Sequence, residues 1–345
     1  MEIKNYAPVR IHTLNRYEKF RACFESLEAC TGAEKTEVFI GLDYPPSEKY
    51  VDGWKKIDVF LKEKEKKNSF KKLHVYRRTK NCGIGNPNSN ASLLDKEIRK
   101  TFDRWISSED DNIFSPNFLE YINKGLEKFK DDSSVYAICG YSHPYGFFYN
   151  NNNHFRHQTD MSAWGYGVLK ERQLELEQFA RKRLFWKLFS LRNLLKMKKF
   201  GYNRLLLFID LSLSYKKNIT DGMCSFYMQI TDKYVIVPTI SKVRNVGWDL
   251  EGNSFKKGMS EREKNRANYH NKQLIDQSAT FEYIGDSWVD VDINNLIAVN
   301  KSDGKITLFN FLTQVMVIIP RRIIGNIYRS TICLYKSFSR RGRYK

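Results

Sequence analysis

The chain has little cysteine, and its cysteines are not spaced as pairs. Six occur among 345 residues, without a CxxC or any other ligand spacing: Cys23, Cys30, Cys82, Cys139, Cys224 and Cys333. A disulfide scaffold and a cysteine-bound zinc site are therefore excluded as the basis of the fold. The chain also lacks a leader with a basic end, an apolar middle and a small-residue cleavage site before its first strand-like segment. We expect a reduced, cytoplasmic protein.

Two common binding motifs are missing as well. The segment Gly83-Ile84-Gly85 is not a GxGxxG fingerprint, and Pro87 would break the helix that such a motif needs, which excludes a dinucleotide site. His154 and His157 lie in an asparagine-rich loop with no third ligand nearby in sequence, which argues against zinc.

Acidic residues are absent from the end of the chain. The formal charge is +19, from 58 basic and 39 acidic residues, and no acidic residue follows Asp303. Nine basic residues do follow it: Lys305, Arg321, Arg322, Arg329, Lys336, Arg340, Arg341, Arg343 and Lys345. Positive charge concentrated in this way calls for a local partner or another local explanation.

The chain does contain enough apolar sequence for one large domain. It is 41% hydrophobic and 14% aromatic, which excludes a disordered composition. Strand-like segments alternate with helical patterns along the first half, with strands expected at 8–12, 36–43 and 72–77 and helices at 17–29, 54–66 and 91–102. This alternation predicts an α/β fold with a mostly parallel central sheet flanked by helices.

Polar residues follow the ends of these predicted strands. They are Asn15, Arg16, Asp43, Asn81, Gly83 and the triplet Glu109-Asp110-Asp111. Open parallel sheets bind ligands beyond the carboxyl ends of their strands, and right-handed crossovers would place these residues along one rim.

The acidic triplet is the most informative of these features. It ends a short apolar run that begins at Trp105. Mg²⁺ and Mn²⁺ prefer oxygen ligands and usually take one or two protein carboxylates together with substrate phosphates. An acidic turn is the alternative, because Asp and Asn favour turns for backbone reasons. The other polar residues at the same rim favour the cation site.

In order and spacing, these features resemble the nucleotide-sugar glycosyltransferases of the GT-A (Rossmann-like) fold, most of all bacterial polysaccharide and lipopolysaccharide enzymes related to N-acetylglucosaminyltransferase I. The segments that carry the likeness are 8–16, 109–111 as a DXD-type motif, 162–166, 220–221 and 237–248. The likeness covers about residues 6–253. We therefore expect a GT-A catalytic domain at 1–255, a connecting segment at 256–303 and a basic amphipathic tail at 304–345.

The resemblance implies a role for each of these positions. Asp111 would ligate Mn²⁺ or Mg²⁺, with Glu109 as a further metal residue and Asp110 in support. The positions implied for holding the nucleotide are Thr13, Asn15, Arg16, Asp43, Asn81, Gly83, Glu109 and Asp110. For Asp43 the alternative is a plain turn before Pro45.

Asp221 takes the place of the catalytic base of inverting members. The family often has Trp before that acid, whereas this chain has Thr220. A helix N-cap is an equally open interpretation of Asp221.

The sugars would lie beside Trp164, Gly165, Tyr166, Arg244 and Asn245, with the last two neutralising the pyrophosphate. For the aromatic residues the alternative is a place in the core, and for Asn245 it is a turn. The implied partners are a nucleotide-sugar donor and a glycan acceptor, which could be lipid-linked.

The tail combines apolar residues with arginine. Its uninterrupted apolar stretch, Val315 to Ile319, is far too short to span a bilayer, which needs about 20 residues. We therefore expect an in-plane helix on an anionic membrane, with the protein held at the inner face of the cell membrane. The alternative is a helix that packs on the domain and leaves its basic end in solvent.

The predicted function is metal-dependent, inverting transfer of a hexosyl or N-acetylhexosaminyl group in cell-surface polysaccharide synthesis. A basic nucleic-acid-binding protein is the first rival, but no RNP, zinc-finger or helix-turn-helix signature supports it, and we expect no nucleic-acid partner. A sugar nucleotidyltransferase is the second rival. It would need a glycine-rich basic loop after the first strand, which Thr13 to Arg16 lacks.

Overall fold

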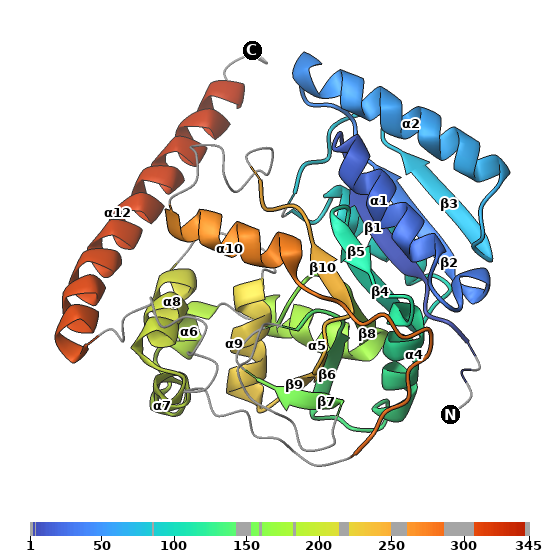
Figure 1. Ribbon diagram of the computed structural model, residues 1–345. Coiled ribbons are helices and arrows are strands. Elements are labelled where there is room, and N and C mark those ends of the chain that lie inside the picture. Colours follow the sequence, from blue (N-terminus) through green and yellow to red (C-terminus); the bar gives the residue numbers. More distant parts are fainter. Residues whose placement is uncertain are drawn as a thin grey trace.

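Strands from distant parts of the chain form one eight-stranded sheet in a computed structural model (Figure 1). The structure describes residues 3, 5–84, 86–142, 153–158, 161–181, 184–213, 221–249, 261–285 and 307–341. The sheet order is β3-β2-β1-β4-β8-β6-β9-β7. These strands are β1 (Val9–Thr13), β2 (Glu37–Leu42), β3 (Lys72–Arg77), β4 (Arg104–Glu109), β6 (Val135–Cys139), β7 (His154–His157), β8 (Tyr166–Leu169) and β9 (Tyr234–Pro238).

Most of the sheet is parallel. Strand β1 lies between β2 and β4 and is parallel to both, and β3 continues this half beside β2. Strand β8 runs against β4 and β6, and β7 runs against β9. A separate antiparallel pair joins β5 (Asn112–Phe114) to β10 (Val243–Asn245).

Helices cover both faces of the sheet and bury one apolar core on each. The described helices are α1 (Tyr17–Glu28), η1 (Ala33–Lys35), η2 (Glu48–Tyr50), α2 (Val51–Lys66), α3 (Asn90–Ile98), α4 (Phe118–Lys128), α5 (Lys170–Arg181), α6 (Leu184–Lys187), α7 (Leu191–Lys199), α8 (Tyr202–Ser212), α9 (Asp221–Thr231), α10 (Glu261–Lys272) and α12 (Leu308–Arg341). Alternate strand residues point to opposite faces. Ile40 accordingly packs with α1, α2 and α4, whereas Phe39 packs with α3, α5 and α9.

The predicted fold class is confirmed. The expected strands at 8–12, 36–43 and 72–77 correspond to β1, β2 and β3, and the expected helices between them correspond to α1 and α2. Alternation of strand and helix was the correct signal, because a parallel pair needs a crossover between its strands. The predicted C-terminal helix is also present as α12.

Residues 261–285 pack against the sheet domain, although part of the expected connecting segment 256–303 lies here. Phe281 and Tyr283 join the core beneath α4, and buried Lys242 forms an ion pair with Asp276. Residues 286–303 lie outside the described residues. The domain boundaries themselves stay predictions.

Helix α12 is longer and more continuous than its apolar residues suggested. One 21-residue segment, Leu308–Tyr328, has a mean hydropathy of 1.3 and is long and apolar enough to cross a membrane by length and composition alone. The expectation that the apolar stretch is too short to span was therefore wrong on length, since the helix extends it on both sides of Val315 to Ile319. Only 6% of the segment's most apolar window is buried in the protein.

Candidate functional site

The carboxyl ends of β1 and β4 bring two carboxylates beside a threonine and an arginine. The register pairs His12 with Glu109, so the chain leaves both strands at the same level of the sheet. Directly after this point, Thr13 donates a hydrogen bond from its hydroxyl to Asp110 Oδ2 at 2.8 Å. Asp110 and Asp111 are only 6% and 5% exposed. The predicted convergence at one rim is confirmed for these residues.

Arg16 bridges the two carboxylates. Its guanidinium pairs with Asp111 Oδ2 at 2.8 Å through Nη1 and with Asp110 Oδ1 through Nη2. Burial alone would lower the pKa of Arg16, but the two neighbouring carboxylates outweigh burial and raise it. Arg16 also immediately precedes α1, and its carbonyl accepts the Phe20 N–H, so the helix fixes its backbone.

The β5–β10 pair supplies a second support for Asp111. Asn245 donates from Nδ2 to Asp111 Oδ1 at 2.6 Å and to Asn112 Oδ1 at 3.0 Å. The Val246 N–H donates to the Asp111 carbonyl at 2.8 Å. A Cβ atom on Gly247 would lie 1.9 Å from Asp111 Oδ2, so this position accepts only glycine without a shift of the carboxylate.

Negative charge at this cluster exceeds its nearest positive charge. Burial and the charge of Asp110 raise the pKa of Asp111, against the opposing effects of Arg16 and Asn245. His12 adds no positive charge near neutral pH, because burial and the neighbouring Arg10 lower its pKa to about 4. Two buried carboxylates therefore face one guanidinium.

This arrangement fits a divalent cation on the condition that a bound diphosphate supplies further ligands. Among the described residues, no group of three His, Cys, Asp or Glu side chains could hold a metal by itself. All four oxygens of Asp110 and Asp111 already accept from Thr13, Arg16 or Asn245. The excess negative charge suits a cation whose other ligands come from a bound diphosphate and water. The residues thus fit a cation that arrives with a nucleotide better than one that binds alone.

Asp43 organises the neighbouring loop. Its carboxylate accepts from the backbone N–H groups of Cys82 at 2.8 Å and Gly83 at 3.2 Å, and from Asn81 Nδ2 at 3.3 Å. Gly83 has φ of +64°, a conformation that favours glycine. Asp43, Asn81 and Gly83, all predicted for the nucleotide site, do lie together. The hydrogen bonds that the Asp43 carboxylate accepts hold this loop in shape.

Trp54 lies in the same region and was not predicted as a site residue. A Cβ atom on Gly53 would lie 2.0 Å from the Asn15 carbonyl oxygen, so the start of α2 packs tightly on the predicted nucleotide segment. The indole N–H of Trp54 is buried and has no hydrogen-bond partner among the described residues, and its ring lies 6.2 Å from the ring of Tyr44. The helical spacing of Trp54 indicated only a core position.

Trp164 belongs to an aromatic group at the other end of the site. Its ring makes edge contacts with Tyr141 at 4.6 Å, His270 at 5.2 Å and Trp248 at 6.1 Å. His270 lies on α10, its Nδ1 is 2.7 Å from the Tyr141 hydroxyl, and its ring stacks on Trp248. His270 and Tyr141 were not predicted, because their meeting depends on how α10 docks.

The other predicted sugar-contacting residues lie in different places. Tyr166 packs in the core on the α3–α5–α9 side, where burial raises its pKa. Gly165 has φ of +72°, and its carbonyl accepts the Gly140 N–H at 2.7 Å, so it shapes the turn into β8.

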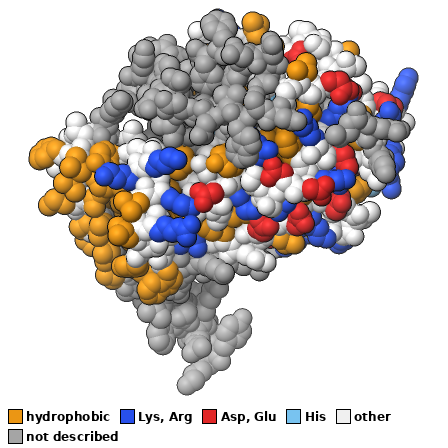
Figure 2. Space-filling view, turned by 90° about the horizontal axis from the view of Figure 1, so that it is seen from below, with side chains coloured by type: hydrophobic (Ala, Val, Ile, Leu, Met, Phe, Trp, Pro, Cys, Tyr) orange, Lys and Arg blue, Asp and Glu red, His pale blue; other side chains and the backbone are white. Residues whose placement is uncertain are grey.

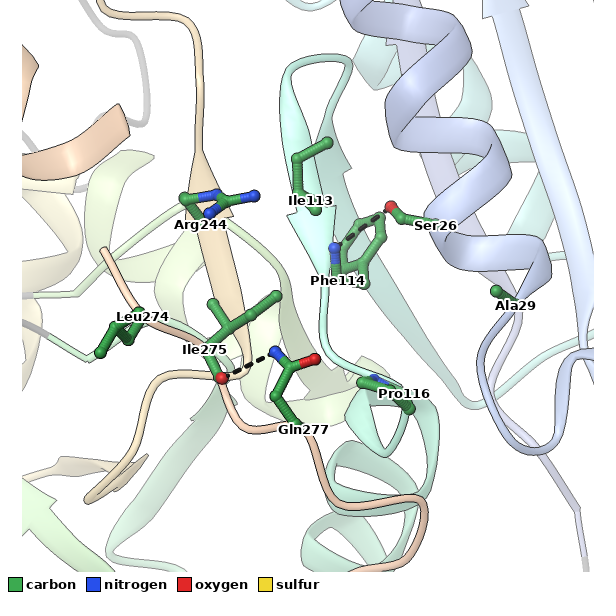
Figure 3. Close-up of a pocket in the computed structure, with 9 residues that line it drawn as sticks. All are labelled: Ser26, Ala29, Ile113, Phe114, Pro116, Arg244, Leu274, Ile275 and Gln277. Atoms are coloured by element: carbon green, nitrogen blue, oxygen red, sulfur yellow. Dashed lines mark hydrogen bonds between the residues drawn. The ribbon is translucent and has the colours of Figure 1, made fainter. Parts of the chain in front are cut away.

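Arg244 points into a separate cavity (Figure 3). The cavity has a volume of about 330 Å³ and lies between α1, β5 and the segment around Ile275. Side chains of neighbouring residues in a strand point to opposite faces. The Asn245 side chain reaches Asp111, and the Arg244 side chain therefore points away from it. A role for Arg244 at the pyrophosphate stays a prediction.

Two further predicted residues are placed by the backbone. Glu109 is the last residue of β4 and pairs in register with His12, so the two side chains share one face of the sheet. Asp221 is the first residue of α9, and its side chain lies outside the described residues.

Comparison with solved structures finds proteins, a mannosyltransferase among them, that are similar to the chain at 12% identity. S. aureus TarS 1–349 in complex with UDP matches 69% of this chain and 59% of its own, with a TM-score of 0.38. The mannosyltransferase PcManGT from Pyrobaculum calidifontis, in complex with GDP-Man and Mn²⁺, matches 69% of this chain and 57% of its own at 0.29. A further S. aureus TarS structure matches 77% and 42% at 0.34.

Each match covers less than two thirds of the other protein's chain. Similarity at these TM-scores assigns neither a family nor an activity. No protein-family model matches the chain. No curated protein matches it either.

Proposed function

We propose that the protein is a GT-A-type glycosyltransferase that moves a sugar from a nucleoside-diphosphate donor to a hydroxyl group of a glycan. The observation that carries the proposal is the buried Asp110–Asp111 pair at the carboxyl edge of a mostly parallel sheet, held by Thr13, Arg16 and Asn245. Such an edge is where open α/β sheets bind ligands, and the loop of Asp43, Asn81 and Gly83 lies on the next strand along.

The diphosphate is the part of the donor that this cluster suits. A Mn²⁺ or Mg²⁺ ion would be held by Asp111 with Asp110 in support, and it would stabilise the negative charge that develops on the leaving diphosphate. When the diphosphate binds, the Arg16 guanidinium would leave one of its two carboxylate partners and pair with a phosphate oxygen. The loop of Asp43 and the buried N–H of Trp54 would then face the nucleoside.

The acceptor hydroxyl would attack the anomeric carbon while its bond to the diphosphate breaks. The diphosphate leaves with the bonding electrons, and the hydroxyl proton passes to a carboxylate. Asp221 at the start of α9 is our candidate for that base, which gives inversion in a single displacement. Trp164 and Trp248, which meet beside Gly247, offer aromatic surface for a sugar ring.

The first experiment is thermal stabilisation by nucleotide sugars, each with and without Mn²⁺, because ligand binding raises the apparent stability of the folded state. We expect one donor class to stabilise the protein and Mn²⁺ to increase that effect. Mn²⁺ alone should have little effect, because Arg16 occupies the carboxylates. The Arg16→Gln variant should gain stabilisation by Mn²⁺ alone, whereas Arg21→Gln on the exposed side of α1 should not.

Product analysis then distinguishes the chemistry. Incubation of the stabilising donor with glycan acceptors should release a nucleoside diphosphate, and Asp221→Asn should keep donor binding but lose transfer. Release of pyrophosphate would instead identify a sugar nucleotidyltransferase. Failure of every nucleotide sugar and nucleoside diphosphate to stabilise the protein would overturn the proposal.

A further inference from the structure

The net charge of the protein comes almost entirely from two segments. Residues 178–209 contain nine Lys and Arg and no Asp or Glu, and residues 304–345 also contain nine and none. Of the 58 basic and 39 acidic residues in the chain, the remainder therefore keeps 40 basic and 39 acidic. The rest of the protein is close to neutral.

These two segments fold against each other. One face of α12 packs along α8: the Phe311 ring stacks on Tyr202 at 5.0 Å, and Val315 and Ile318 follow in the same core. Further along this face, Arg322 donates two hydrogen bonds to Asp210, one of them from Nε at 2.6 Å. The spacing of these α12 residues, every three or four positions, defines a single stripe.

Outside this stripe, large apolar side chains are exposed along the Leu308–Tyr328 part of α12. Phe309, Met316 and Ile324 are 73%, 74% and 65% exposed. Helices α6 and α7, which pack on the same α8, and the turn between them add further large exposed side chains: Phe185, Trp186, Phe189, Leu191 and Leu195. We call these exposed apolar residues, with the lysines and arginines among them, the α6–α8–α12 surface. Figure 2 shows hydrophobic side chains gathered at one side of the molecule, with Lys and Arg beside them.

We propose that the α6–α8–α12 surface docks on an anionic lipid bilayer. Contiguous exposed apolar surface next to basic residues is what a membrane-surface helix needs, because acyl chains take the apolar side chains and lipid phosphates attract the cations. A nucleic acid would match the charge but not the aliphatic side chains of Met316, Ile324 and Leu195, since bases bind on aromatic platforms. A protein interface would deplete lysine from its centre.

The packing of α12 favours an in-plane position over a crossing one. The segment Leu308–Tyr328 is long enough to span, but Pro320, Arg321 and Arg322 lie near its middle. Arg322 is tied to Asp210 of α8, so insertion of α12 across the bilayer would break this ion pair or carry it into the hydrocarbon. Charged groups there are costly. The stripe on α8 and the exposed faces opposite it together suit a helix that lies along the surface.

The test is sedimentation of the protein with vesicles of phosphatidylcholine, with and without 30% phosphatidylglycerol. We expect binding to the anionic vesicles that is released by high salt, and little binding to the neutral ones. The triple variant Arg192→Glu, Lys198→Glu, Lys199→Glu alters exposed charges of α7. Because each basic group contributes about fivefold to affinity, loss of three positive charges should weaken binding about a hundredfold, and repulsion of the three new carboxylates makes this the minimum expected effect.

Matched variants separate the surface from general effects. The variant Lys55→Glu, Lys56→Glu, Lys66→Glu on α2 changes the same number of exposed basic residues and should bind like the wild type. Met316→Glu with Ile324→Glu should weaken binding at least tenfold, whereas Val59→Glu, at a 55% exposed position on α2, should not. Circular dichroism and the melting temperature verify that each variant is folded.

Several outcomes would overturn the proposal. These are equal binding to neutral vesicles, unchanged binding of the α7 triple variant, and tighter binding to duplex DNA than to anionic vesicles at equal salt. Resistance of the bound protein to high salt and to alkaline carbonate would indicate a spanning helix. Self-association that Met316→Glu abolishes, without vesicle binding, would assign the surface to a second copy of the chain. Vesicle binding is measured without sugar transfer, so failure of this proposal and failure of the proposed function can be distinguished.

Discussion

The carboxyl edge of the sheet and the α6–α8–α12 surface hold their charged side chains in opposite environments, buried at the edge and exposed at the surface. At the edge, Asp110 and Asp111 are almost fully buried, and each oxygen has a donor on Thr13, Arg16 or Asn245. At the surface, Arg192, Lys198 and Lys199 are exposed beside apolar side chains, and their own segment contains no carboxylate.

This difference distinguishes two kinds of binding region. Buried charges must be held by partners, because an unpaired buried charge costs several kcal/mol, so the edge is rigid and suits a small ligand of defined geometry. Exposed charges over a wide apolar area need no defined partners and suit a large, deformable one. Three of the predictions below change one of these two regions and leave the other intact, and one tests the segment that follows α10.

The largest effect should come from Asp111→Asn. The amide keeps the shape of the side chain and an acceptor for Arg16, but it removes the negative charge that a cation with a diphosphate needs. We expect donor turnover to fall about a thousandfold, as when a central electrostatic group of an active site is removed. Steady-state release of nucleoside diphosphate measures this effect, with Asp131→Asn at an exposed position as the control. Turnover within tenfold of the wild type would contradict the metal assignment.

Much of the edge could be predicted from the sequence, because it depends on local order. Strands that end in Thr13, Leu42 and Glu109 deliver Arg16, Asp43 and Asp111 to one rim whenever the sheet is parallel. The signal is the alternation of strand and helix together with the type of residue that follows each strand.

Contacts that β10 and α10 make with the site could not be predicted from the sequence. That Asn245 rather than Arg244 reaches Asp111 depends on the register of β10 against β5. His270 reaches Trp164 only because α10 docks there, and an isolated histidine in a polar helix carries no such signal. The exposed apolar side chains of α6 and α7 could not be predicted either, since exposure is a property of packing.

The second prediction concerns the segment that follows α10. Lys242 is 2% exposed, pairs with Asp276, and lies over the Phe281 ring at 4.5 Å. Lys242→Met should lower the free energy of unfolding by about 3 kcal/mol, because it leaves a partly buried carboxylate without its cation. Chemical denaturation measures the loss. Adding Asp276→Asn should restore part of it, and a loss below 1 kcal/mol would show that the segment contributes little to the domain.

The third prediction concerns the pH dependence of the free energy of unfolding that is due to His12 at the carboxyl edge. Burial and Arg10 hold the pKa of His12 at about 4, below the 6.5 of an unfolded chain. Below pH 6.5 the unfolded chain takes up a proton that the folded protein does not, so stability falls as the pH drops towards 4. Between pH 7.5 and 5 the wild type should lose about 2 kcal/mol more than His12→Gln. Parallel denaturation curves for the two proteins would contradict a buried neutral His12.

The smallest effect on stability should come from the exposed face of α12. Ile324 is 65% exposed, so Ile324→Ser should change the free energy of unfolding by less than about 0.5 kcal/mol. Ile318 lies six residues earlier on the stripe against α8, and Ile318→Ser should cost more than about 1 kcal/mol. If both variants are equally stable, α12 does not pack on α8 in solution. If only Ile318 matters for folding, the apolar side chain of Ile324 is present for a reason outside the folded domain.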